Sequence, residues 1–378
     1  MVNRVCRVCG RELFGEPLLR FENMPKAAQN FPDETVLALD AGVDLDVCQC
    51  MGCGLVQLGN EPVPYYREVI RAAAVSDVIR KFKTRQFADF IEKYFLNGKK
   101  ILEVGCGRGE FLSLLSSFDV EAYGMEYSET AVAECVRNGL RVSQGYPDQN
   151  AGSLANGPFD GFMLLMFLEH MPEPNVALRV IYDNLANNAV GLVEVPNFDM
   201  VIRKKLFSEF IGDHLFYFTK ETLQTTLQLN GFDVLEYNEV RDDYVISVVV
   251  KKRGRLNISH FHDYQIKIKT DIDAYLNRFA AKRVAIWGAG HQALAIIALT
   301  GIADKIRYVV DSASFKQGKY TPATHLPIVA PEALHTDPVD AVIVMAASYS
   351  DEVVGILRQR FDPNLSVAIL RDFGLEPV

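Results

Sequence analysis

The chain has 378 residues, of which 49% are hydrophobic, and a formal net charge of −9 at pH 7. This length can bury more than one hydrophobic core, so we expect several domains. The acidic balance and the absence of long basic runs argue against nonspecific nucleic-acid binding. No apolar run approaches the roughly twenty residues of a membrane span, and the first residues lack a signal-peptide pattern, so we expect a cytoplasmic protein with no membrane partner.

Residues 1–65 contain two C-x-x-C pairs, which are Cys6/Cys9 and Cys50/Cys53. A glycine follows each pair and frees the turn to donate N–H groups to thiolates. Four thiolates at this spacing are typical of structural zinc, whereas a redox dithiol, the alternative, needs only one pair. Cys48 is a competing ligand because it precedes Cys50 by two positions. We therefore expect a loop-rich zinc-binding module in which the metal substitutes for a hydrophobic core.

Residues 66–253 read as an α/β domain. Apolar positions recur at helical spacing from Tyr65 to Phe95, which predicts one or two amphipathic helices. Apolar runs then alternate with helical stretches, which predicts a parallel sheet. The predicted strands are 101–104, 120–125, 140–143, 159–165, 189–195, 232–237 and 244–251.

The first strand of this domain runs into a glycine turn just before a helix. Its glycines, Gly105, Gly107 and Gly109, have the spacing G-x-G-x-G, which lets backbone N–H groups approach a nucleoside closely. The second strand ends on Glu126, an acidic residue placed to accept hydrogen bonds from both ribose hydroxyls. Together the two features predict a nucleoside-binding site.

Two histidines are candidates for chemistry. His170 follows strand 159–165 and so lies at the carboxyl edge of the sheet, where ligands bind in open α/β folds. His214 stands among aromatic residues with Asp213 beside it, which predicts a general base tuned near neutral pH. The alternative role for either histidine is a helix cap or a packing residue.

Residues 254–378 predict a second, small doubly wound sheet. We expect a helix over 264–280 and strands over 284–287, 306–310 and 341–345. Gly288 and Gly290 follow the first of these strands, and Asp311 ends the second, so a nicotinamide oxidoreductase is an alternative interpretation. In the loop that follows, Lys316, Lys319 and His325 can meet a diphosphate or can be solvated surface charges.

The order of these motifs resembles that of the three-domain sugar C-methyltransferases. The resemblance rests on the cysteine pairs, Ala28–Phe31, Glu103–Gly109, Leu168–His170, Asp213–Phe218 and Gly318–Pro327, and it spans almost the full chain. It implies a class I, Rossmann-like, S-adenosylmethionine-dependent methyltransferase domain between a zinc module and a second Rossmann-like domain. Such enzymes methylate a carbon next to the ketone of a nucleotide-linked 4-keto-deoxysugar.

The resemblance also implies roles for individual residues. His214 removes the proton α to the ketone, and the resulting enolate attacks the methyl group of S-adenosylmethionine. The other catalytic or pocket residues are His170, Asp213, Tyr65 and Tyr66. The cofactor residues are Glu103 at the methionine end, Glu126 at the ribose, and Gly105, Gly107, Gly109 and Met166. Zinc, held by Cys6, Cys9, Cys50 and Cys53, is structural.

The chain departs from the family pattern near His214. Asp213 stands where a glutamate is usual, and Ile211 replaces a tyrosine that is a candidate oxyanion donor. An O- or N-methyltransferase on a related sugar nucleotide therefore stays open, as does a non-catalytic S-adenosylmethionine-binding module. No oligomer is implied, and a monomer is the default expectation.

Overall fold

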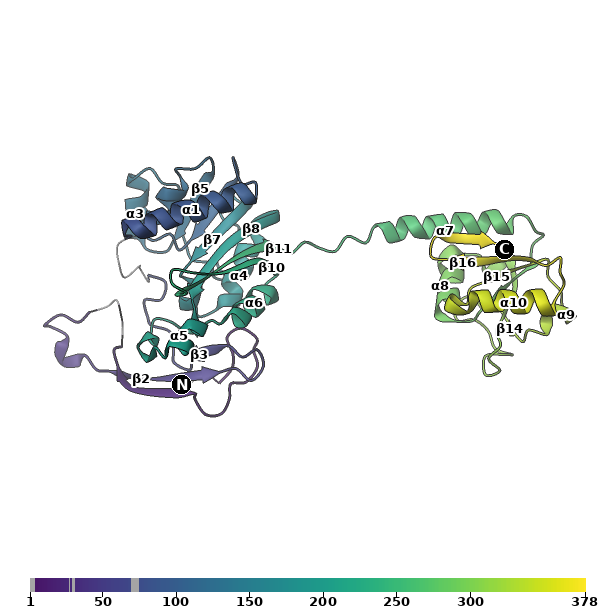
Figure 1. Cartoon of the computed structure of the whole chain (residues 1–378), viewed down its shortest axis with the longest axis horizontal. Helices are drawn as coiled ribbons and strands as arrows, with labels where there is room; N and C mark the ends of the chain where they lie inside the picture. The colour runs from purple at the N-terminus through teal and green to yellow at the C-terminus, as the bar shows by residue number, and fades with distance from the viewer. Residues whose placement is uncertain (1–3, 27, 29–30, 69–74) are drawn as a thin grey trace. The chain divides into compact units, whose positions relative to one another are not determined.

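The computed structural model describes residues 4–26, 28, 31–68 and 75–378, which fold into two compact units, Met1–Gly254 and Arg255–Val378 (Figure 1). The zinc module and the methyltransferase domain that were expected from the sequence share the first unit. Gln29 and Asn30 of the Ala28–Phe31 motif lie outside the described residues, as do residues 69–74 of the predicted helical stretch. Within the described part of the chain, no helix is long and apolar enough to cross a membrane.

A seven-stranded sheet in the order β10-β11-β8-β7-β4-β5-β6 forms the centre of the first unit. Its strands are β4 (Lys100–Val104), β5 (Glu121–Glu126), β6 (Val142–Gln144), β7 (Phe159–Leu165), β8 (Leu185–Pro196), β10 (Phe232–Val240) and β11 (Val245–Lys252). The strands from β4 to β8 are parallel, but β11 pairs antiparallel with both β8 and β10. The predicted parallel sheet is confirmed for β4 to β8, whereas the closing pair is antiparallel because a short turn joins β10 to β11 and a hairpin can only be antiparallel.

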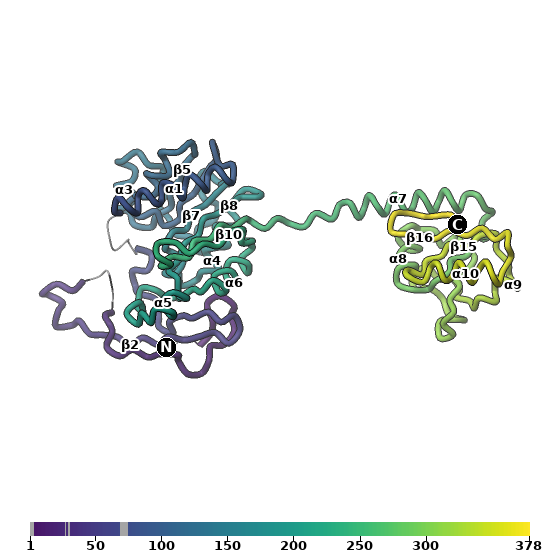
Figure 2. The backbone as a smooth tube through the Cα atoms, in the orientation of Figure 1, coloured from purple at the N-terminus to yellow at the C-terminus, as the bar shows by residue number. Residues whose placement is uncertain are grey.

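Helices cover both faces of this sheet, as the ribbon and the backbone tube show (Figures 1 and 2). Buried apolar side chains fill both interfaces. One face carries α1 (Asp77–Lys93) and α2 (Glu110–Leu115), and α3 (Glu129–Arg137) packs beside β5 and β6. The opposite face carries α4 (Pro174–Asp183) and α6 (Lys220–Leu229). Of the one or two helices predicted between Tyr65 and Phe95, the described residues contain α1, which begins at Asp77, where the Ser76 side chain accepts the N–H of Ile79. The predicted α/β class is confirmed.

The N-terminal module is a small antiparallel sheet in the order β1-β2-β3-β9. Its own strands are β1 (Leu19–Met24), β2 (Val43–Gln49) and β3 (Val56–Leu58), with a short helix η1 (Leu37–Leu39) between the first two. The fourth strand, β9 (Phe216–Tyr217), comes from the methyltransferase segment. Buried Leu45, Val47 and Leu58 pack with Phe198 and Phe210. The prediction of a module without a core was wrong, since the module shares an apolar core with the chain around β9.

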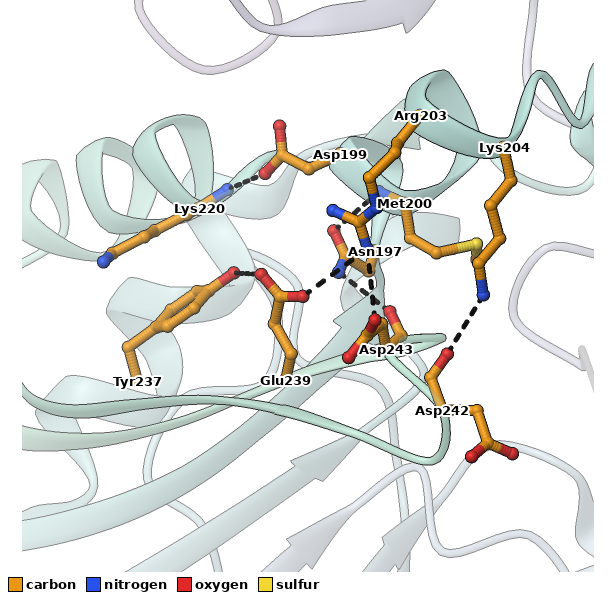
Figure 3. A network of polar contacts seen from close by, with 10 residues as sticks. All are labelled: Asn197, Asp199, Met200, Arg203, Lys204, Lys220, Tyr237, Glu239, Asp242 and Asp243. Carbon is orange, nitrogen blue, oxygen red and sulfur yellow. Dashed lines mark hydrogen bonds and ion pairs between the residues drawn. The ribbon is translucent and has the colours of Figure 1, made fainter.

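The segment between β8 and β9 contains α5 (Phe198–Lys204) and η3 (Phe207–Glu209). Asn197 caps α5 by accepting the N–H of Met200, and its amide donates to the carbonyl of Asp243 at 2.8 Å (Figure 3). In the turn between β10 and β11, residues 241–243 have positive φ values of 56°, 56° and 67°. Arg203 pairs with Asp243, and Lys204 donates to the carbonyl of Asp242. This network ties the β10–β11 turn to α5 and so fixes where the chain turns toward residues 205–215.

The second unit is a six-stranded sheet in the order β14-β13-β12-β15-β16-β17, in which only β17 is antiparallel. Its elements are α7 (His260–Leu276), β12 (Val284–Trp287), α8 (His291–Thr300), η4 (Ala303–Lys305), β13 (Ile306–Val310), β14 (Ile328–Val329), α9 (Ala333–Thr336), β15 (Ala341–Val344), η5 (Ala347–Tyr349), α10 (Ser350–Arg360), β16 (Ser366–Arg371) and β17 (Gly374–Pro377). Helices α7 and α8 pack on one face, and α9 and α10 pack on the other. Strands β14, β16 and β17 were not predicted from the sequence.

Candidate active site

The glycine turn after β4 has a backbone conformation that residues with a side chain rarely adopt. Gly105, Gly107 and Gly109 have φ values of 72°, 56° and 84°. A Cβ atom on Gly105 would lie 2.4 Å from the Phe167 ring, and one on Gly109 would lie 2.5 Å from Leu140. Glycine is therefore required for conformation and for space at both positions. The turn leads directly into α2, as predicted.

Glu126 at the end of β5 is tied to this turn. Its carboxylate accepts the N–H of Gly107 and the N–H of Ser128, both at 2.9 Å. Each oxygen keeps a second lone pair, so the carboxylate can also accept ribose hydroxyls. Glu103 is buried in β4, and Met166 follows β7 with a φ of 55°. These residues lie at the carboxyl ends of adjacent parallel strands, the edge at which open α/β sheets bind ligands.

An aromatic cage that the sequence analysis missed stands next to Glu126. The Arg67 guanidinium carbon lies 5.4–5.5 Å from the ring centroids of Tyr66, Tyr127 and Tyr146, and Arg67 pairs with Asp148 at 3.1 Å. Among the described residues, neither Arg67 Nε nor Tyr146 Oη has a hydrogen-bond partner. Two features of the sequence could have indicated this cage: Tyr127 directly follows Glu126, and Tyr146 comes just after β6.

The two predicted histidines lie together. His170 ends the short helix η2 (Leu168–His170), and its ring centroid is 4.7 Å from that of His214 in an edge-to-face arrangement. His170 Nδ1 lies 2.7 Å from the carbonyl oxygen of Asp213, so Nδ1 carries the proton and Nε2 keeps a lone pair. Burial lowers the pKa of His170 to about 4, and burial with the neighbouring His170 lowers the pKa of His214 to about 3. The expectation of a pKa near neutral was wrong for His214, and both imidazoles are neutral at pH 7.

Asp213 does not act on the His214 ring as expected from its place in the sequence. Its carboxylate accepts the Tyr65 hydroxyl at 2.7 Å and the Ala28 N–H at 2.9 Å. Its backbone carbonyl bonds to His170 and not to His214, and the charge of its carboxylate acts on His170 as well. Tyr65 thus joins the histidine pair, whereas Tyr66 joins the aromatic cage.

Glu169 is a second residue that the sequence analysis passed over. Its side chain is 1% exposed, and burial raises its pKa to about 8. One oxygen lies 3.9 Å from His170 Nε2, and among the described residues the other oxygen has no hydrogen-bond partner. Ligand atoms of Glu169, His170 and His214 all lie within 4.8 Å of one another, so this set can hold a divalent cation.

The four predicted cysteine ligands come together in the N-terminal module. The sulfur atoms of Cys6 and Cys53 are 3.7 Å apart, and those of Cys9 and Cys50 are 3.3 Å apart. A tetrahedron with bonds of about 2.3 Å has edges of about 3.8 Å, so the cluster fits zinc. Backbone N–H groups point at the Cys6 and Cys50 sulfurs, as thiolate ligands require. Cys48 is not in the cluster and donates to the carbonyl of Asp46.

The C-terminal unit repeats the acidic strand end. The Asp311 carboxylate accepts the N–H of Ala289 at 2.8 Å, as Glu126 accepts that of Gly107. Lys316, one of the predicted diphosphate contacts, instead pairs with Asp311 at 2.8 Å.

Known proteins resemble the chain in both units. Residues 79–237 match a family described as a methyltransferase domain, and residues 250–364 match one described as a C-methyltransferase C-terminal domain. The C-methyltransferase NovU of Streptomyces niveus is 23% identical over 92% of this chain and 91% of its own length. A ubiquinone biosynthesis O-methyltransferase of Methylococcus capsulatus is 36% identical over 21% of this chain and 35% of its own length. A solved S-adenosylmethionine-dependent methyltransferase from Clostridium acetobutylicum is 14% identical, covers 50% of this chain and 96% of its own, and has a TM-score of 0.40.

The fold, the glycine turn and these matches define an S-adenosylmethionine-dependent methyltransferase. Both family matches occur in one chain, and the likeness to a C-methyltransferase runs nearly end to end. The chain is therefore similar to the C-methyltransferases over almost its whole length, as its motifs predicted.

Proposed function

We propose that this methyltransferase adds a methyl group to the carbon next to the ketone of a nucleotide-linked 4-keto-deoxysugar. The observation that carries the proposal is the pair of neutral histidines, His170 buried and His214 half-buried, that lies beside the Tyr65–Asp213 hydrogen bond. A neutral imidazole can accept a proton, and a carbon next to a ketone is far more acidic than an ordinary C–H group.

In this proposal His214 is the general base. A ring nitrogen takes the proton from the α carbon, the C–H electron pair becomes the enolate, and the enolate carbon then forms the new C–C bond. Bound S-adenosylmethionine supplies the electrophilic methyl group and leaves as the neutral thioether. The pKa of His214 is depressed to about 3 without substrate, so the imidazolium form is unstable there. The negative charge of the enolate stabilises the new imidazolium while the two lie side by side. His170, fixed by the Asp213 carbonyl, positions the His214 ring.

The cofactor is assigned to the strand ends around the glycine turn. Glu126 would hold the ribose hydroxyls. The N–H groups of residues 105, 106, 107 and 109 already bond within the protein, so the glycine turn would serve the nucleoside by allowing its close approach to the backbone. Glu103 and Met166 are assigned to the methionine end. Structural zinc is assigned to the Cys6, Cys9, Cys50 and Cys53 cluster, where it would hold the module against β9.

O-methylation is the second candidate, and the Glu169, His170 and His214 set favours it. A divalent cation held there would lower the pKa of an acceptor hydroxyl and create an oxygen nucleophile. In that reaction no α C–H bond breaks. Loss of activity after chelation, with recovery on Mn²⁺ or Fe²⁺ but not on Zn²⁺, would favour this candidate, because two imidazoles and one carboxylate suit these ions better than Mg²⁺.

Deuterium exchange tests the proposed function. The protein is incubated in heavy water with S-adenosylhomocysteine and a panel of nucleotide-linked 4-keto-deoxysugars, and the sugars are analysed by mass spectrometry. We expect solvent deuterium at the α carbon with the native protein and with His262→Ala, whose histidine is exposed on α7, but not with His214→Ala. With S-adenosylmethionine the same sugar should gain one methyl group. A methylated sugar without exchange would contradict the enolate mechanism.

A further inference from the structure

Three side chains that can bind a metal converge at the histidine pair. They are Glu169 and His170 of η2 and His214 of the loop before β9, and we call them the imidazole–carboxylate cluster. Their ligand atoms all lie within 4.8 Å of one another, and one Glu169 oxygen is 3.9 Å from His170 Nε2. Two ligands of one tetrahedral ion, each about 2.1 Å from it, are about 3.4 Å apart. Modest side-chain rotations would therefore close the cluster around a single ion.

His170 is held in the way that metal-binding histidines are held. Its Nδ1 donates to the Asp213 carbonyl at 2.7 Å, which leaves the lone pair on Nε2, the nitrogen nearer to Glu169. Histidines that bind metals in proteins commonly donate the other ring N–H to a backbone carbonyl or a carboxylate. This hydrogen bond fixes the tautomer and the orientation of the ring before any ion binds.

Glu169 supplies a buried oxygen atom that lacks a partner. Its side chain is 1% exposed, and among the described residues Oε2 forms no hydrogen bond. A buried polar atom without a partner destabilises the folded state. A cation bound by the cluster would satisfy this atom, and the carboxyl proton would leave as the ion binds.

The cluster is open on the side of His214 and can select its ion. His214 is half-buried, whereas Glu169 and His170 are buried. Three protein ligands leave a coordination position for water, unlike the closed site of the four cysteines. Two imidazole nitrogens and one carboxylate suit Zn²⁺, Co²⁺ or Ni²⁺, whereas Mg²⁺ and Ca²⁺ prefer oxygen ligands. The negative charge of Asp213 acts on His170 and also favours a cation here.

We propose that Glu169, His170 and His214 form a second metal site, which binds a divalent transition metal and stops C-methylation while it is occupied. An ion held there would take the His214 lone pair that accepts the α proton in the proposed reaction. The inhibitory effect therefore rests on the proposed function, but the binding of the metal does not. Zinc would act in two opposite ways on this chain, since the cysteine site supports the fold and the second site blocks the reaction.

Cobalt titration tests the site without reference to turnover. The full chain with its structural zinc in place is titrated calorimetrically with CoCl₂, and elemental analysis checks that the zinc is retained. We expect about one Co²⁺ per chain for the native protein and for His262→Ala, whose histidine is exposed on α7. Binding should be weaker by about 10-fold or more for His214→Ala and for Glu169→Gln, which keeps the shape of the side chain. Equal Co²⁺ affinity in all four proteins would overturn the site.

Inhibition is measured by deuterium exchange and methylation with the same panel of 4-keto sugars. Added Zn²⁺ or Ni²⁺ should stop both reactions, Mg²⁺ at the same concentration should not, and brief treatment with EDTA that leaves the cysteine-bound zinc in place should restore them. Glu169→Gln should need about 10-fold more Zn²⁺ than the native enzyme for the same inhibition.

The other outcomes separate the metal site from the proposed function. Activation by the added metal, or equal inhibition of the native enzyme and Glu169→Gln, would overturn the inhibitory role. If Co²⁺ binds at the cluster but the enzyme with an empty cluster supports neither exchange nor methylation, the metal site stands and the proposed function fails.

Discussion

The Tyr65 hydroxyl donates a 2.7 Å hydrogen bond to the Asp213 carboxylate, joining residues 148 positions apart in the chain. Asp213 is 2% exposed, and its carbonyl in turn orients His170. The segment that carries Tyr65 also carries Tyr66 and Arg67 of the aromatic cage. One short stretch therefore contacts both Asp213, which orients His170, and the region next to Glu126, which are the acceptor and cofactor sides of the proposed site.

Tyr65→Phe should lower kcat about 10-fold and change the Kd for S-adenosylhomocysteine by less than twofold. The variant removes a hydrogen bond to a buried carboxylate, which costs about 1.5–3 kcal/mol, but it keeps the ring. Tyr264→Phe, in the C-terminal unit, is the matched control. Single-turnover kinetics and calorimetric titration separate the two effects, and an unchanged kcat would show that the Asp213 carboxylate does not need this partner.

The protonation of Glu169 should appear in the pH dependence of stability. Its pKa is raised from 4.5 to about 8, so between these values the folded state holds a proton that the unfolded state has released, and stability falls as pH rises. The histidines act in the opposite sense at lower pH. Because the pKa values of His170 and His214 fall from 6.5 to about 4 and 3, stability rises with pH from about 3 to 6.5.

Glu169→Gln should therefore raise the free energy of unfolding at pH 8 by roughly 2 kcal/mol or more, since each pKa unit corresponds to about 1.4 kcal/mol. At pH 5 the increase should be much smaller. Urea unfolding at several pH values measures this difference. Glu92→Gln, at an exposed position of α1, is the control. The same shift at pH 5 and pH 8 would mean that the Glu169 carboxyl is not protonated in the folded protein.

Arg67→Ala should weaken binding of S-adenosylhomocysteine by about fivefold or more. This is the effect expected from the loss of one partly desolvated cation–π contact, which is worth about 1 kcal/mol. The cage follows the ends of β5 and β6, next to the assigned ribose site at Glu126, so the adenine base is expected beside it. Arg67→Lys should recover only part of the affinity, because an ammonium group cannot stack or form the planar contact to Asp148.

Calorimetric titration measures both Arg67 variants without reference to turnover. Arg137→Ala, at an exposed position of α3, is the control. Tighter binding by Arg67→Ala would show that Arg67 occupies the place of the base and must leave before the cofactor binds.

The sequence predicted what depends on local pattern. The glycine turn at Gly105, the acidic strand end at Glu126 and the cysteine pairs follow from spacing along the chain, and all lie where strand ends or turns were expected. The antiparallel pairing of β11 with β8 and the pairing of β9 with β3 depend on which strands become neighbours in a sheet. Hydrophobic periodicity does not contain this information. The pKa of His214 was misjudged because burial and the approach of His170 decide it, and neither can be read from neighbouring residues in the sequence.

Zinc should be needed for the catalytic loop as well as for the module, because β9, directly after His214 and Leu215, completes the module's sheet. Cys50→Ser should lose the metal, lower Tm by several degrees and reduce activity at least 10-fold, since a missing ligand opens a closed tetrahedral site. Cys48→Ser is the matched control, because Cys48 lies two residues away, is buried and stands outside the cluster. Elemental analysis of the purified proteins should give about one zinc per chain for the native enzyme and for Cys48→Ser, and little for Cys50→Ser. A Cys50→Ser protein that keeps both its zinc and its Tm would refute the assignment of this residue as a ligand.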